Sequence, residues 1–95
     1  MKEIIKDLYN IDVLTFIKIS DKVYKIKTLD KEYALKYIEQ SNLDFIIEKL
    51  NIINVNSFVY PLKNSLNEYT SSFEGVYFIV LPWVETDNVM ILFLR

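Results

Sequence analysis

The sequence predicts a single α+β domain over residues 1–95, built on a five- or six-stranded twisted antiparallel sheet with one packed helix and a short N-terminal helix. Three observations predict this fold class. Most of the chain alternates apolar and polar residues, or forms short β-branched and aromatic runs, which is typical of strands. Two stretches instead repeat apolar residues at helical spacing. The 95 residues include one Gly and two Pro, and no repeat or flexible linker divides them.

The first half of the chain predicts a short helix followed by three strands. Residues 2–9 carry Ile4, Ile5 and Leu8 at helical spacing with charged residues between them, so we expect an amphipathic helix that lies on the sheet. Strands are expected in three segments, namely 13–19, 23–28 and 33–38. The short polar connections at 20–22 and 29–32 favour an antiparallel meander, and Asp30-Lys31-Glu32 is predicted to be a solvated turn.

The second half predicts a longer helix and then further strands. Ser41 or Asn42 can cap a helix with an apolar stripe at Leu43, Ile46, Ile47, Leu50 and Ile53. A strand is expected at 58–63, where Pro61 favours an edge or a strand start. A turn at 64–67 and weak alternation at 68–72 follow. Glu74-Gly75 predicts a tight turn into 76–81, an uninterrupted apolar segment expected to be a buried central strand.

Composition excludes several classes of function. The chain has no Cys and no His, so it offers no Cys/His zinc site, no cysteine nucleophile and no histidine acid or base. The net charge of −2 gives no reason to expect nucleic acid as a partner. The apolar runs are shorter than the roughly 20 residues of a membrane span, and the acidic N-terminus is unlike a signal peptide. We therefore expect a cytoplasmic protein that does not enter the membrane.

The segment around Lys36 carries the most informative pattern. Alternation along the predicted strand places Ala34 and Lys36 on one face, with Tyr33, Leu35 and Tyr37 on the other. A small apolar residue leaves room for a flat base, and an ammonium beside it supplies a charge for phosphates. The alternative is an ordinary solvated lysine on an outer face of the sheet. A buried Lys36 would require a partner carboxylate, and Glu48, Glu39 and Asp44 are the candidates.

Five segments in order resemble the amino-terminal lobe of the spore-coat (CotS-like) family, which belongs to the aminoglycoside-phosphotransferase-like, protein-kinase-like superfamily. They are Lys22 to Thr28, Tyr33-Ala34-Leu35-Lys36, Leu43 to Glu48, Tyr60-Pro61-Leu62-Lys63 and Tyr77 to Glu85. The resemblance implies a bacterial protein in which Lys36 binds the α- and β-phosphates of ATP and Glu48 holds Lys36 in place. It also implies a hinge whose backbone meets adenine, formed by Leu81, Pro82, Trp83 and Val84.

The resemblance also limits the expected activity. The loop that is often glycine-rich in relatives reads Ile19-Ser20-Asp21-Lys22 here, and Asp21 would repel phosphate, so we expect weak nucleotide binding. The family's His-Gly-Asp catalytic loop and metal-binding Asp lie beyond the hinge. We therefore expect no catalysis by residues 1–95 alone and no bound cofactor, with ATP and Mg²⁺ held only together with a carboxyl-terminal lobe.

Other interpretations of the same residues remain open. Trp83 can equally be a core anchor, and Glu48 can be solvent-exposed. The apolar segment 88–95 must pack on the domain, on a missing carboxyl-terminal lobe or on a second copy in a homodimer. The competing function is a small structural or self-associating protein, such as a spore-coat component, with no nucleotide role. A third interpretation is an unrelated α+β domain in which the Ala-Leu-Lys pattern is a coincidence.

Overall fold

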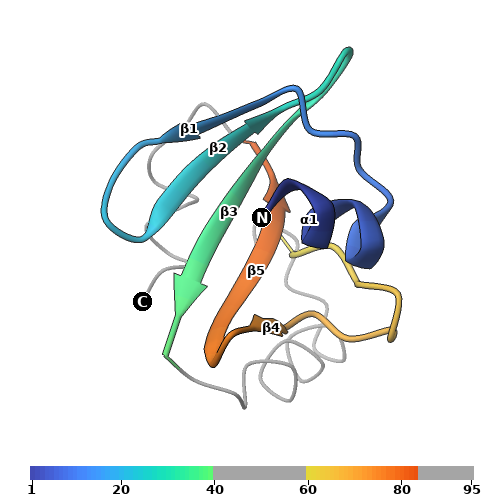
Figure 1. Cartoon of the computed structure of the whole chain (residues 1–95), viewed down its shortest axis with the longest axis vertical. Helices are drawn as coiled ribbons and strands as arrows, with labels where there is room; N and C mark the ends of the chain where they lie inside the picture. The colour runs from blue at the N-terminus through green and yellow to red at the C-terminus, as the bar shows by residue number, and fades with distance from the viewer. Residues whose placement is uncertain (40–59, 84–95) are drawn as a thin grey trace.

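A computed structural model of the chain describes residues 1–39 and 60–83 (Figure 1). These residues form one helix and five strands. Their bounds are α1 Lys2–Tyr9, β1 Thr15–Lys18, β2 Val23–Lys27, β3 Glu32–Ile38, β4 Ser71–Phe73 and β5 Val76–Pro82. All five strands belong to one antiparallel sheet in the order β1-β2-β3-β5-β4. The predicted fold class, a twisted antiparallel sheet with a short N-terminal helix, is confirmed.

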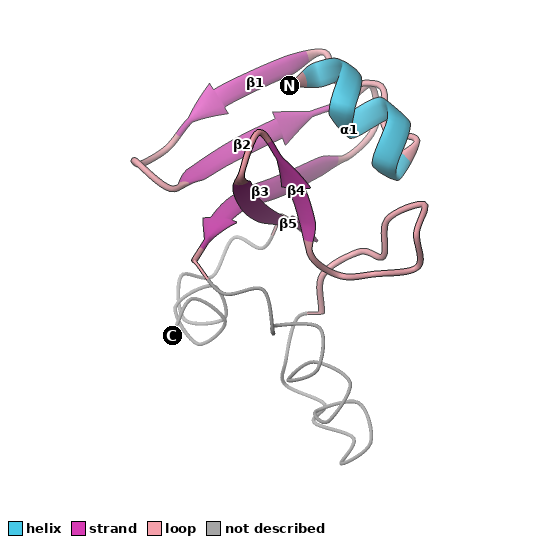
Figure 2. Cartoon of the chain, turned by 60° about the horizontal axis from the view of Figure 1, so that its bottom comes forward, coloured by secondary structure: helices cyan, strands magenta, loops and turns pink. Residues whose placement is uncertain are grey.

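The α1 helix forms where its apolar spacing predicts it and ends at Asn10. Asn10 adopts a left-handed conformation with φ 57°, and its N–H donates to the carbonyl of Lys6 at 2.9 Å. Asparagine tolerates this conformation because its short polar side chain can bond locally. Ile5 is fully buried and directs the apolar side of α1 onto the sheet. The helix therefore covers one face of the sheet, as Figures 1 and 2 show.

The register of the strands separates two faces with different residues. We call the side under α1 the helix face, with a core of Ile26, Leu35, Phe78 and Val80 around Ile5. Alternation places the intervening residues on the opposite side, which we call the lysine face. It carries Lys25 on β2, Ala34 and Lys36 on β3, and Ile79 and Leu81 on β5. The β5 strand contributes buried residues to both faces, as predicted for a central strand.

The hairpin from β4 to β5 is joined to α1 by a buried polar cluster. Glu74 and Gly75 form its turn with φ 53° and 78°, which explains the glycine. Asn64 is 7% exposed, and its Nδ2 donates to the Ser71 hydroxyl at 2.8 Å. That hydroxyl also lies 2.7 Å from the Tyr9 hydroxyl. The Oδ1 of Asn64 accepts from the backbone N–H groups of Leu66 and Glu68.

Two sequence predictions need correction. Residues 60–63 form no strand, although the N–H of Leu62 donates to the carbonyl of Val80 at 2.8 Å. One backbone hydrogen bond to β5 does not make a strand, and Pro61 has no N–H to donate to a partner on its other side. Glu32 is not part of a solvated turn, because it begins β3 and pairs with lysines. The predicted helix from Ser41 and the segment 88–95 lie outside the described residues.

Candidate functional site

The candidate site is built on the lysine face around Ala34. In the register of the sheet, Lys25, Ala34 and Leu81 lie side by side across β2, β3 and β5. The next row on the same face holds Val23, Lys36 and Ile79. Ala34, Ile79 and Leu81 are each fully buried and form a second core cluster, with Trp83 packed against it. The predicted sharing of one face by Ala34 and Lys36 is therefore confirmed.

Lys36 is a partly buried cation in an unfavourable environment. Burial, and to a smaller degree the charge of Lys22, lowers the pKa of its ammonium from the ordinary value of 10.5. Within residues 1–39 and 60–83, no carboxylate lies within ion-pair distance of Lys36. Glu39, one of the predicted partners, pairs with Lys22 at 3.1 Å instead. Glu48 and Asp44, the other two, lie outside the described residues. The environment of Lys36 thus favours the approach of an anion.

The segment predicted to be the hinge continues the pairing of β5 with β3. The N–H of Trp83 donates to the carbonyl of Glu32 at 3.1 Å, one residue beyond the Tyr33–Pro82 pair. Successive residues of a strand direct their backbone groups to opposite neighbours, so the position of Pro82 faces away from β3. Its missing N–H therefore costs no bond with β3. Leu81 is buried while Pro82 is exposed, and Val84 lies outside the described residues.

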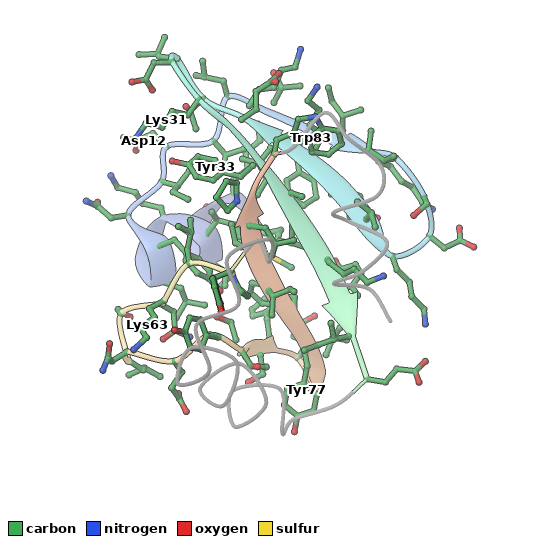
Figure 3. All side chains as sticks on the ribbon, turned by 180° about the vertical axis from the view of Figure 1, so that it is seen from behind. Asp12, Lys31, Tyr33, Lys63, Tyr77 and Trp83 are labelled. Carbon is green, nitrogen blue, oxygen red and sulfur yellow. The ribbon has the colours of Figure 1, made fainter. Side chains whose placement is uncertain are left out.

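Charged side chains cluster beside Trp83, and this cluster was not predicted from the sequence. The Lys25 ammonium lies 4.6 Å from the centroid of the indole and 3.4 Å from a carboxylate oxygen of Glu32. Lys27 lies 3.8 Å from the same oxygen. The Lys25 side chain is only 19% exposed. Alternation along 23–28 could have indicated that Lys25 and Lys27 share a face, but only the strand register brings them to Glu32 and Trp83. Figure 3 shows Trp83 near the β2–β3 end of this face, with Tyr77 at the far end of β5.

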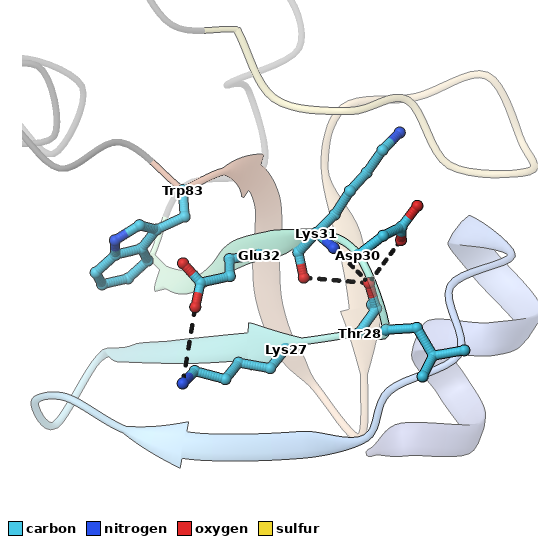
Figure 4. Close-up of a pocket in the computed structure, with 7 residues that line it drawn as sticks. Lys27, Thr28, Asp30, Lys31, Glu32 and Trp83 are labelled. Carbon is cyan, nitrogen blue, oxygen red and sulfur yellow. Dashed lines mark hydrogen bonds and ion pairs between the residues drawn. The ribbon is translucent and has the colours of Figure 1, made fainter.

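A shallow cavity of about 460 Å³ opens beside this cluster (Figure 4). It is lined by Trp83, Glu32 and Lys27 together with residues 28–31 of the β2–β3 hairpin. Hydrogen bonds close the hairpin: the Thr28 hydroxyl accepts from the N–H of Lys31 at 3.0 Å, and the N–H of Thr28 donates to the carbonyl of Lys31 at 2.9 Å. Leu29 projects into solvent with 91% of its surface exposed. The cavity is therefore open and polar and lies next to the predicted hinge.

The connection between β1 and β2 does not form an open phosphate-binding loop. The N–H groups of Ile19 and Ser20 both donate to the carbonyl of Val23, at 2.9 and 3.1 Å. Asp21 lies 3.7 Å from Lys18, and both side chains are largely exposed. A glycine-rich loop binds phosphate through free N–H groups, and here two of them are already engaged. This loop therefore offers no free N–H of Ile19 or Ser20 to a phosphate.

The described residues contain neither a metal-binding group nor a membrane-spanning helix. Residues 1–39 and 60–83 contain no group of three acidic side chains arranged to hold a metal ion. None of the helices in this part of the chain is long and apolar enough to cross a membrane. The described side chains of the candidate site are lysines, the Glu32 carboxylate, the indole of Trp83 and an apolar floor.

Comparison with known proteins supports the fold. No protein-family model and no curated protein matches the sequence. The structure is similar to the AMP-bound complex of spectinomycin phosphotransferase, APH(9)-Ia, with a TM-score of 0.76 and 20% identity. The complex of that enzyme with ADP and spectinomycin gives 0.72 and 19%. Each match covers 88% of this chain but 28% of the phosphotransferase. At this level of identity the similarity concerns the fold, and the described sheet matches a kinase-like amino-terminal lobe.

Proposed function

We propose that this chain is the amino-terminal lobe of a phosphotransferase related to the aminoglycoside-phosphotransferase-like and CotS-like spore-coat proteins. In this proposal the lysine face forms half of an ATP site. Lys36 contacts the phosphates, Ala34 forms the floor for the base, and the segment from Leu81 through Trp83 to Val84 forms the hinge. Glu48 would orient Lys36. We further propose that the protein is bacterial, that it is located in the cytoplasm, and that it is associated with the spore.

The observation that carries this proposal is the position of Lys36. It lies on the face of the sheet opposite α1, beside Ala34 and Ile79, and its ammonium is partly buried with no carboxylate partner in the described residues. An unpaired cation of this kind lowers the stability of the domain unless an anion neutralises it. The fold is also similar to that of spectinomycin phosphotransferase, an enzyme whose structure was determined with bound AMP, and this similarity supports a nucleotide site here.

Residues 1–95 are not expected to transfer phosphate by themselves. Phosphoryl transfer needs an acceptor base and side chains that hold Mg²⁺, which kinase-like enzymes place on a second lobe. We therefore propose that a carboxyl-terminal lobe is the partner that completes the site. ATP and Mg²⁺ would bind firmly only in that assembly.

The test is a calorimetric titration of the full chain with millimolar ATP. We expect weak binding that Lys36→Ala reduces by about tenfold, since a charge-assisted contact with phosphate contributes about 1.5–3 kcal/mol. Lys18→Ala is the matched control because Lys18 is an exposed lysine on β1 that lies on the helix face. Equal affinity of wild type and Lys36→Ala would refute the role of Lys36. The absence of any heat with ATP would instead favour the self-associating structural protein.

A further inference from the structure

The strand positions show that the side chains of Trp83 and Lys25 meet above β3. Lys25 belongs to β2 and Trp83 follows β5, and β3 lies between these strands. Neighbouring strands are about 4.8 Å apart, so β2 and β5 are separated by about 9.6 Å. A distance of 4.6 Å from the Lys25 ammonium to the indole centroid requires both side chains to reach over β3. On that side of β3, Ala34 lies opposite Lys25 in the register, with Glu32 and Lys36 two residues away in either direction.

Ala34 is the residue that makes this crossing possible. It lies between Lys25 and Leu81 in the register, it is fully buried, and Trp83 packs against its cluster. Its methyl group leaves a flat space above β3, and the indole is a flat ring packed against that cluster. The room that the proposed function assigns to the base of a nucleotide is therefore taken by a side chain of the protein itself.

Two interactions hold the indole of Trp83 in place, and one unsatisfied hydrogen-bond donor destabilises it there. The Lys25 ammonium lies over the indole, and Glu32 keeps Lys25 in position through the 3.4 Å ion pair. The Nε1–H of Trp83, however, is buried and has no hydrogen-bond partner in the described part of the chain. A buried donor without an acceptor costs free energy, which release of the ring into water would recover. The unpaired Nε1–H thus lowers the free energy needed to move the ring away from the cluster.

We propose that the indole of Trp83 occupies the base-binding position above Ala34 and that a nucleotide base binds there only after the ring moves away. This inference rests on the proposed function. It adds a self-blocking contact to the same site, by which we mean that the indole of Trp83 occupies the place of the base. The Lys25–Glu32 ion pair helps to hold the indole in that position. Weak binding by the isolated chain then follows from competition with its own side chain, in addition to the lack of a glycine-rich loop.

Trp83 is the only tryptophan of the chain, so its fluorescence reports on this ring alone. We expect ATP to shift the emission of the wild-type chain to longer wavelength and to increase quenching by acrylamide as the ring enters water. Adenosine, which lacks phosphates, should produce the same shift at higher concentration. Binding of ATP that leaves the emission and the quenching unchanged would contradict the inference, because the ring would not have moved.

Variants separate this inference from the proposed function. Trp83→Ala should bind both adenosine and ATP about tenfold more tightly than wild type, because no internal ring competes for the site. Lys25→Met keeps the ring but removes its cation, and it should give a smaller gain in affinity. Lys27→Met is the matched control, because Lys27 also contacts Glu32 but makes no contact with the indole that the structure records. Lys27→Met should bind adenosine as wild type does.

The outcomes are distinguishable. If Trp83→Ala and Lys25→Met bind adenosine no more tightly than wild type, while Lys36→Ala still weakens ATP binding, the self-blocking contact is refuted and the nucleotide half-site stands. If neither wild type nor any variant binds ATP or adenosine, the proposed function fails and this inference fails with it. Lys25→Met keeps the test decisive where Trp83→Ala reduces stability.

Discussion

The two faces of the sheet share one backbone but carry side chains of different chemistry. The helix face buries Ile26, Leu35, Phe78 and Val80 under α1, and its contacts are apolar and aromatic. The lysine face combines a small apolar cluster with three lysines, a carboxylate shared by two of them, and a tryptophan whose buried Nε1–H has no partner within residues 1–39 and 60–83. The first arrangement supplies stability, whereas the second retains unfavourable groups. Residues that lower stability without an evident compensation are typical of binding sites.

The two faces should differ most in the unfolding free energy that an alanine substitution removes, and two adjacent residues of β5 allow this comparison. Phe78→Ala removes a fully buried ring from the helix face and should cost about 3–5 kcal/mol of unfolding free energy. Tyr77→Ala alters the lysine face at a side chain that is 38% exposed and should cost less than about 1 kcal/mol. Urea denaturation measures both values. Equal costs would show that the helix face is not the main core.

The polar cluster between α1 and β4 sharpens the comparison, because its buried polar groups are satisfied. Asn64→Ala removes a side chain that donates to Ser71 and accepts from Leu66 and Glu68, and it should cost about 2 kcal/mol. Asn67→Gly is the control, since Asn67 has φ 63° and glycine adopts this conformation readily. Thermal unfolding that shows no loss for Asn64→Ala would refute the structural role of the cluster.

Lys36 should behave in the opposite way to Asn64. Its pKa is lower in the folded state than the ordinary 10.5, so the folded state is penalised wherever Lys36 is charged. Lys36→Met should therefore be more stable than wild type at neutral pH. The difference should shrink as the pH rises from the lowered pKa of Lys36 toward 10.5. The raised pKa of Tyr37 affects both proteins equally and cancels in this comparison. A Lys36→Met variant that is less stable at pH 7 would contradict the account.

The smallest expected effect is on the pH dependence of ATP binding. Phosphate binds the charged form of Lys36, and the lowered pKa means that this charge is lost at a lower pH than in an exposed lysine. As the pH is raised, the affinity of wild type for ATP should begin to fall before pH 10.5 is reached. The affinity of Lys36→Ala should stay constant over the same range. A parallel decline in both proteins would assign the titration to another group.

Periodicity and turn chemistry predicted most of the described fold. The helix at residues 2–9, the three-strand meander and the Glu74-Gly75 turn follow local rules, and the structure confirms them. The prediction of a strand at 58–63 was wrong for residues 60–63. Residue pattern alone does not distinguish a strand from a segment that contains Pro61 and contacts β5 through the backbone N–H of Leu62. The cluster of Lys25, Glu32 and Trp83 was missed because it depends on the register between β2, β3 and β5, which no local pattern encodes. Ala34 and Lys36 were placed correctly, because alternation within one strand is sufficient.

The most direct test of the central claim is a map of amide chemical shifts during titration of the ¹⁵N-labelled chain with ATP. The account predicts that the perturbed amides belong to Ala34, Lys36, Leu81 and Trp83, together with the indole N–H of Trp83. Residues of α1, such as Ile5, should remain unchanged. Perturbations confined to the helix face, or none at millimolar ATP, would contradict a nucleotide half-site on the lysine face.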